Sequence, residues 1–359
     1  MTFSRLRKYT LMLSVLVMAT GLIWLGCSQE PATAPDYNPS GFSQSAALLP
    51  AQAADIAKVM AVQDRNTVDL EKIDGVFGTA VGRDASGGIV ILALTDKPDN
   101  ARIPASIEGV SVRRMVTDRP TLFPKPPGGG GVDFKSRVAR PVPMGYSIGN
   151  YLECAAGTFG CVVYKGGSPY ILSNNHVLAR QNAGERGEEI GQPGLYDNKP
   201  ACSGYWADTI GSLWEFVPVQ TGPNANNTVD CAIAATSFAM VQCTTPNGFY
   251  GQPNTQLVDA SLDLPIQKVG RTSGRTTGTV IGINATVTLA YAGVNTRFVD
   301  QVLTSSGFSK SGDSGSLIVT NDANANPVAL LFAGNRQGYT WGNRIQNVTQ
   351  ALNVTICGK

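Results

Sequence analysis

The sequence predicts a mainly β protein, and three observations support this. Short runs rich in valine, isoleucine, threonine and glycine alternate with turn signals from about residue 138 to residue 359, as is typical of a barrel or a sandwich. A helical pattern at residues 344–352 closes this region. Before it, residues 49–118 combine a helical pattern with β-like runs, which predicts a small α+β domain.

The elements of the N-terminal domain follow from hydrophobic periodicity. Residues 51–62 place their apolar side chains near one helical face. Residues 75–81 and 88–94 read as two strands joined by the turn-forming sequence of residues 83–88, and residues 110–116 read as a further strand. We find no recognisable chemistry in this domain, so it is predicted to serve folding, regulation or positioning.

Residues 119–137 predict a linker between this domain and the C-terminal domain of residues 138–359. They contain several prolines and four consecutive glycines at residues 128–131. Such a composition buries too little apolar surface to fold by itself.

The strands of the C-terminal domain are predicted from short apolar runs bounded by turn residues. These runs are residues 157–164, 170–172, 231–234, 278–283, 287–289 and 316–320.

The N-terminus predicts export. Arg5, Arg7 and Lys8 precede an uncharged apolar stretch at residues 11–25, and Cys27 follows it. Residues 1–27 therefore resemble a bacterial lipoprotein signal that is cleaved before an acylated Cys27, although that box usually carries a small aliphatic residue where Trp24 stands. Residues 28–48 would then be a flexible tether to the membrane of the cell envelope, in the periplasm or at the outer surface. An uncleaved anchor or ordinary secretion are the alternatives.

The cysteine content agrees with export, and the net charge argues against nucleic acid as a partner. Seven cysteines leave six once Cys27 is reserved for lipid, which allows up to three disulfides in an oxidising compartment. Cys154 and Cys161 are the simplest local pair. The formal net charge of +2 becomes −1 when the signal takes away its three positive charges, so nucleic acid is not a predicted partner.

Three motifs in chain order point to serine-nucleophile chemistry. The only histidine, His176, lies in Ser-Asn-Asn-His-Val-Leu at residues 173–178. Asp230 begins an apolar run, and Ser314 lies in Gly-Asp-Ser-Gly at residues 312–315. A serine hydroxyl needs an imidazole to take its proton, and the imidazole needs a buried carboxylate to fix its tautomer. Gly312 permits a tight turn whose amides can bind an oxyanion.

Together these motifs resemble the trypsin-like (chymotrypsin-fold) serine peptidases over about residues 150–340. They are most similar to the bacterial branch whose histidine motif reads Ser-Asn-Asn-His-Val-Leu. The resemblance implies two six-stranded antiparallel β-barrels with the site between them and a polypeptide substrate. It also implies that His176 acts as general base and then acid, that Asp230 orients it, and that Ser314 is the nucleophile.

The same resemblance assigns further residues around the nucleophile. The amides of Gly312 and Ser314 would form the oxyanion hole, and Asp313 would help to hold their loop. Phe308 would line the specificity pocket and make it shallow. The backbone of Ala333, Gly334 and Asn335 would pair with the substrate.

Two charged residues and one departure bear on specificity. Lys310 and Arg336 would favour acidic substrates or simply be solvated. Ser316 stands where digestive members of the family have glycine. The substrate preference stays open.

Two further segments hint at phosphate or metal binding, but each has a simpler structural interpretation. The Gly-rich segment at residues 270–278 hints at a phosphate loop but lacks the lysine and spacing, so a strand-and-turn element is favoured. Residues 322–326 mimic the start of a calcium loop, but Pro327 and Ala333 stand where glycine and glutamate are needed, which favours a hairpin tip. One histidine cannot supply a catalytic zinc site, and no metal or cofactor is predicted.

Two other functions compete with an active endopeptidase. A catalytically silent or latent member of the fold would bind a peptide or protein at the cell envelope. An esterase of the α/β-hydrolase class would have the serine first in the chain and a Gly-x-Ser-x-Gly elbow, and the order and motif here differ from both requirements.

Overall fold

The computed structural model describes residue 33 and residues 50–122, 132–203 and 208–359. The predicted signal with Cys27, nearly all of the tether and residues 123–131 of the linker lie outside the described residues. No helix in the described ranges is long and apolar enough to cross a membrane.

The protein is mainly β, and the predicted double-barrel fold with a C-terminal helix is confirmed. In the second barrel the strand order is β12-β15-β16-β17-β14-β13, and β13 pairs back with β12, which closes six antiparallel strands. These strands are β12 (Pro265–Gly270), β13 (Gly274–Tyr291), β14 (Val294–Thr304), β15 (Leu317–Thr320), β16 (Pro327–Gly334) and β17 (Thr340–Arg344).

The first barrel is formed by the sheet β18-β7-β8-β11-β10-β9-β5-β6. Only Phe159 and Gly160 separate β6, at one end of this sheet, from β7, which lies beside β18 at the other end. The strands are β5 (Ser147–Asn150), β6 (Gly157–Thr158), β7 (Cys161–Lys165), β8 (Ser168–Ser173), β9 (Glu189–Gly191), β10 (Thr209–Phe216), β11 (Ala232–Ala235) and β18 (Thr355–Ile356), with a short 3₁₀ helix at Leu195–Asp197.

The C-terminal helix connects the barrels. α3 (Ile345–Leu352) follows β17 of the second barrel, and β18 after it pairs with β7 of the first. Asn353 ends the helix in the left-handed conformation, with φ of 49°. The apolar side of α3, formed by Ile345, Val348 and Leu352, is buried.

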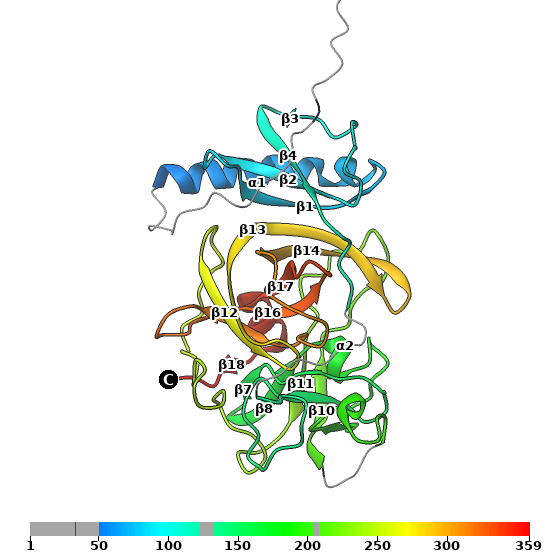
Figure 1. The fold of residues 1–359 in the computed structure, drawn as a ribbon, viewed down its shortest axis with the longest axis vertical. Helices are drawn as coiled ribbons and strands as arrows, with labels where there is room; N and C mark the ends of the chain where they lie inside the picture. The colour runs from blue at the N-terminus through cyan, green and yellow to red at the C-terminus, as the bar shows by residue number, and fades with distance from the viewer. Residues whose placement is uncertain (1–32, 34–49, 123–131, 204–207) are drawn as a thin grey trace, which may run out of the picture.

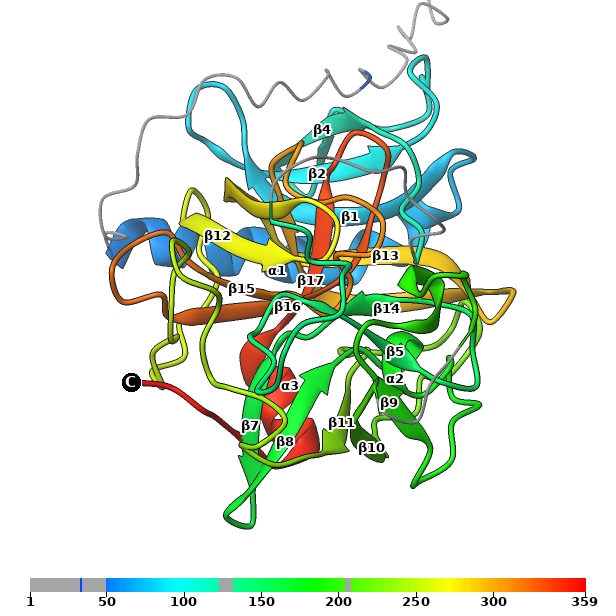
Figure 2. The same ribbon diagram turned by 60° about the horizontal axis from the view of Figure 1, so that its bottom comes forward.

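The N-terminal domain continues the sheet of the second barrel. Its elements are α1 (Pro50–Glu71), β1 (Val76–Arg83), β2 (Ile89–Thr95), β3 (Ser106–Ile107) and β4 (Val110–Val116). β1 pairs antiparallel with β13, while β2 and β4 pair in parallel, so the order β13-β1-β2-β4-β3 extends the barrel sheet. Figure 1 shows this domain at one end of the molecule and the first barrel at the other, and Figure 2 shows the strands from another side.

A bent β13 makes this continuity possible. The sequence predicts two strands here, whereas the structure has one strand of 18 residues. Its register with β14 shifts between Gly282 and Ala285, and Asn284 has a φ of 49°. A bulge therefore replaces the expected break and turns the strand toward β1. Gly78 on β1 approaches so closely that an added Cβ would lie 2.2 Å from the carbonyl oxygen of Thr286.

The described ends of the predicted linker are packed, which differs from the expectation for a segment unable to fold. Phe134 is buried and its ring lies 5.0 Å from that of Tyr146. Pro120 is also buried, and Thr121 pairs with Gly334. The barrel surface supplies the apolar contacts that the linker composition lacks.

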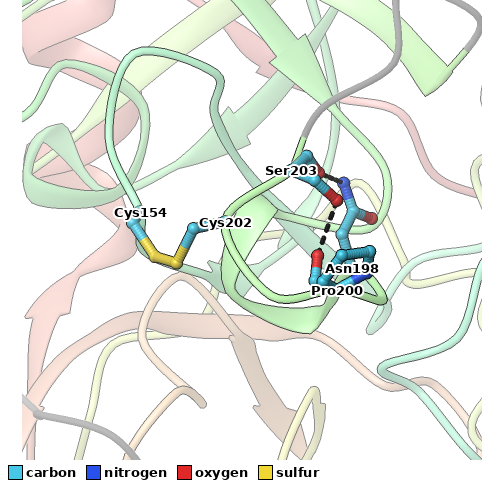
Figure 3. Close-up of a disulfide and its surroundings, with 5 residues drawn as sticks. All are labelled: Cys154, Asn198, Pro200, Cys202 and Ser203. Carbon is cyan, nitrogen blue, oxygen red and sulfur yellow. Dashed lines mark hydrogen bonds between the residues drawn. A yellow bond between two sulfur atoms is a disulfide. The ribbon is translucent and has the colours of Figure 1, made fainter.

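Two disulfides join cysteines in the described residues, and the expected Cys154–Cys161 pair is wrong. Cys154 is bonded to Cys202, as Figure 3 shows, and Cys243 is bonded to Cys357 near the C-terminus. Cys161 and Cys231 are free and buried. Both lie in the apolar core of the first barrel, where burial raises the pKa of each thiol, so they behave as small apolar side chains.

Candidate active site

His176 and Asp230 meet at one end of a strand pair. Ser173 at the end of β8 is paired with Ala232 at the start of β11, and His176 follows in the short helix α2 (Asn175–Leu178). The backbone amide of His176 donates to Asp230 Oδ1 at 3.1 Å, and Nδ1 lies 2.5 Å from Oδ2. Because a carboxylate only accepts hydrogen bonds, this pairing places the proton on Nδ1 and leaves Nε2 as an acceptor.

The three residues before His176 fix its backbone. Ser173 Oγ donates to the carbonyl of Thr158 at 2.8 Å, and Asn174 Nδ2 donates to the carbonyl of Asp230 at 2.8 Å. Asn175 Nδ2 donates to the carbonyl of Val217 at 2.9 Å. The Ser-Asn-Asn part of the motif therefore holds the turn that carries the imidazole.

Asp230 is also held from the second barrel. Its amide donates to Asn343 Oδ1 at 2.9 Å, and Asn343 Nδ2 donates to Gln301 Oε1 at 2.7 Å. Burial and, after it, the Asp230 carboxylate raise the pKa of Tyr291 on β13, so that the phenol stays protonated. Asp230 itself is fully buried, whereas 12 % of the His176 side chain is exposed.

Ser314 lies in the loop between β14 and β15, and two glycines shape this loop. Gly312 has a φ of 92° and Gly315 a φ of 91°, which L-residues with side chains rarely adopt. A Cβ at Gly315 would lie 2.0 Å from Ser173 Oγ, so the loop is packed directly against the end of β8, three residues before His176.

Thr158 on β6 connects the loop that carries Ser314 to the first barrel. Its amide donates to the carbonyl of Ser314 at 2.8 Å, and its hydroxyl donates to the carbonyl of Gly312 at 2.9 Å. The same hydroxyl accepts from the amide of Arg271 at 3.0 Å. Nothing in the sequence near Thr158 signals this role, because its partners are far away in the chain.

The Asp313 carboxylate, next to Ser314, is fully buried in a set of donors. It accepts from the amides of Thr272, Ser273 and Lys310 at 2.8, 3.1 and 2.9 Å, and from Lys268 Nζ at 3.0 Å. Burial by itself would raise the pKa of the Asp313 carboxyl, but the Lys268 ammonium and these hydrogen bonds outweigh it and hold the pKa below its ordinary value.

Lys268 and the turn after β12 hold the Asp313 carboxylate, and the sequence did not predict this role. The segment with a weak likeness to a phosphate loop is the β12–β13 hairpin, and its turn amides do bind an anion, which is the Asp313 carboxylate. Gly270 is required here because a Cβ would lie 2.6 Å from Asp313 Oδ1. The glycine-rich composition of residues 270–278 was the one sequence feature that pointed to an anion-binding turn.

Gly157 contacts both the loop that carries Ser314 and the short helix α2, in which Val177 follows His176. A Cβ at Gly157 would lie 2.5 Å from Val177 Cγ2 and 3.0 Å from the Ser314 carbonyl oxygen. Ser314 Oγ is 3.5 Å from the carbonyl oxygen of Phe332, and no hydrogen bond joins it to His176 in the described part of the chain.

The remaining predicted residues lie in different surroundings. The amides of Gly312 and Ser314 have no acceptor within the described ranges. The Phe308 ring is fully buried in the apolar core of the second barrel. Ala333 is fully buried as well, while the backbone of Gly334 and the side chain of Asn335 contact the segment after β4.

Comparisons with known proteins give structural similarity only. No protein-family model matches the chain, and no curated protein matches its sequence. A glutamic acid specific serine protease is 19% identical, with 60% of this chain and 100% of that chain covered and a TM-score of 0.42. Thermobifida fusca protease A is 15% identical, with coverages of 61% and 99% and a TM-score of 0.43. Cellulomonas bogoriensis chymotrypsin is 16% identical, with coverages of 61% and 99% and a TM-score of 0.41.

The Asp313 anchor gives a pH-dependent prediction. A carboxyl whose pKa is depressed on folding stabilises the protein above its unfolded pKa of about 3.9, and this contribution is lost as the pH falls through the folded pKa. We expect Asp313→Asn to lower the free energy of unfolding by about 3 to 5 kcal/mol at pH 7, because it leaves the Lys268 ammonium buried without its counter-charge.

Urea unfolding at pH 7 and in steps below pH 4 measures this effect. The difference between wild type and Asp313→Asn should shrink as the wild type loses its ionised carboxylate. Asp69→Asn, which removes an exposed partner of Lys72, serves as the control and should change little at either pH. A difference that stays constant across this pH range would contradict the assignment.

Proposed function

We propose that this chain is an exported serine endopeptidase that hydrolyses peptide bonds through Ser314, His176 and Asp230. The observation that carries the proposal is the His176 Nδ1–Asp230 Oδ2 hydrogen bond of 2.5 Å, beside a glycine-shaped loop that carries Ser314. This arrangement fixes the tautomer that a general base for a serine requires.

The proposed reaction proceeds through an acyl-enzyme. Ser314 Oγ attacks the substrate carbonyl carbon while His176 Nε2 takes the hydroxyl proton, and the Asp230 carboxylate stabilises the resulting imidazolium. The amides of Gly312 and Ser314 bind the oxyanion. His176 then gives its proton to the leaving amine, the peptide bond breaks, and an ester to Ser314 remains. Water, deprotonated by His176, hydrolyses that ester and restores the serine.

The substrate-binding residues support a strand-like peptide substrate. β16 ends at Gly334, and its backbone groups can pair with an extended chain, as a sheet edge does. We propose Ala333, Gly334 and Asn335 as this edge. Phe308 is fully buried in the apolar core of the second barrel, and we propose that its ring keeps the specificity pocket shallow.

A catalytically silent peptide-binding protein is the competing function. It is favoured by one observation, namely that Ser314 Oγ contacts the Phe332 carbonyl and has no hydrogen bond to His176 among the described residues. Such a protein would bind peptide at β16 without forming an acyl-enzyme.

Covalent labelling by a fluorophosphonate probe tests the proposed activity. We expect purified protein to be labelled at Ser314, and His176→Ala to lower the labelling rate by a factor of about 10³ or more, because no other histidine can replace it. Ser314→Ala is the matched control. If wild type is labelled no more than Ser314→Ala while peptide binding persists, the silent alternative is correct.

Export and lipid anchoring form a separate part of the proposal. The two disulfides suit an oxidising compartment outside the cytosol. We propose that Cys27 is acylated after signal cleavage and holds the enzyme in the bacterial cell envelope. Metabolic labelling with palmitate should mark wild type and not Cys27→Ser. Equal labelling of the two, or none, would leave the protein secreted or anchored by its uncleaved signal.

A further inference from the structure

The segment after β4 is paired with the edge that a substrate would need. Thr121 and Gly334 form an antiparallel bridge in which the Thr121 amide donates to the Gly334 carbonyl at 2.9 Å. The Gly334 amide donates back to the Thr121 carbonyl at 3.3 Å. Both backbone groups of Gly334 are therefore used by the protein's own chain.

Side chains extend this pairing to residues 117 and 118. Asn335 Nδ2 donates to Thr117 Oγ1 at 2.7 Å and to the Asp118 carbonyl at 2.9 Å. Gln337 Oε1 accepts from Thr117 Oγ1 at 2.7 Å and from the Asp118 amide at 3.0 Å. The Asp118 carboxylate pairs with Arg336 at 3.0 Å. Arg336, a candidate for binding acidic substrates, thus already holds an acidic residue.

The direction of the segment leads toward the nucleophile. In an antiparallel pair, residues after Thr121 face residues before Gly334. Phe332 precedes Gly334 by two residues, and its carbonyl oxygen is 3.5 Å from Ser314 Oγ. Leu122 packs against the apolar cluster that contains Phe332 and Ala333. A substrate strand that reached Ser314 along β16 would need the same backbone groups and the same apolar surface.

Attachment of the segment to the N-terminal domain holds it in place. Arg119 Nε donates to Asp96 Oδ2 at 2.6 Å, and its guanidinium lies 5.3 Å from the centre of the Phe77 ring. β1 of the same domain is paired with β13 of the barrel. The segment is therefore held beside β16 at a high effective concentration, so a free peptide must compete with an intramolecular strand.

We propose that residues 117–122 form a latch, which occupies the substrate edge of β16 in cis and keeps the site latent until it is displaced. This inference rests on the proposed function for its catalytic consequence. The contacts of the latch indicate which substrate could replace it. Such a substrate would be an extended peptide with an acidic residue opposite Arg336 and an apolar residue beside Phe332.

A pair of variants at one position tests the latch. Thr121→Pro removes the amide that donates to Gly334, whereas Thr121→Ala keeps it and alters only an exposed side chain. In the full-length protein we expect Thr121→Pro to raise the rate of fluorophosphonate labelling about 3- to 10-fold, the factor associated with one lost hydrogen bond. Thr121→Ala should be labelled at the wild-type rate.

Equal labelling rates for the two variants, both above Ser314→Ala, would overturn the latch and leave the proposed function intact. If neither variant is labelled above Ser314→Ala, the proposed function fails. A peptide-binding measurement then tests the latch independently of catalytic activity.

That measurement uses both variants in the Ser314→Ala background and a fluorescein-labelled peptide of sequence Thr-Asp-Arg-Pro-Thr-Leu. Fluorescence anisotropy should show at least threefold tighter binding to the Thr121→Pro protein, since its edge is open. Equal affinities of the two proteins would overturn the latch.

Discussion

The buried carboxylate of Asp313 is the interaction on which the proposed active site depends. Enclosing a carboxylate is costly unless charge and hydrogen bonds compensate it. Here Lys268 and the amides of the β12–β13 turn supply that compensation, and they do so one residue before Ser314. The loop conformation that presents Ser314 is therefore stabilised from within the second barrel, whereas Thr158 fixes the same loop to the first barrel.

Sheet continuity links this centre to the N-terminal domain. β13 belongs to the closed barrel and also pairs with β1, so the domain cannot move away without breaking that strand pairing. The segment that leaves the domain passes directly along β16. In the latch that we propose, this connection lets the N-terminal domain control access to the site, because the segment that leaves the domain pairs with the backbone of Gly334.

The sequence predicted those features that depend on local pattern. Strand runs and turn signals predicted the β architecture, and apolar runs beside His176 and Asp230 placed both at strand ends, where β8 and β11 indeed bring them together. Lys268 could not be recognised in this way, because a lysine within a strand ordinarily reads as solvated, and its partner is 45 residues away. The pairing of Cys154 with Cys202 depends likewise on how the loops of the first barrel fold, and proximity in sequence favoured Cys161 instead. The pairing of Thr121 could not be predicted for a related reason: a proline- and glycine-rich composition describes the linker alone and not the end of β16 that it meets.

In the proposed mechanism Asp230 acts on Ser314 only through His176, and a double-mutant cycle on the fluorophosphonate labelling rate measures this dependence. Labelling is compared for wild type, Asp230→Asn, His176→Ala and the double variant. We expect Asp230→Asn to slow labelling greatly when His176 is present and to have no further effect once His176 is alanine. A similar slowing in both backgrounds would contradict it, because Asp230 would then act independently of the imidazole.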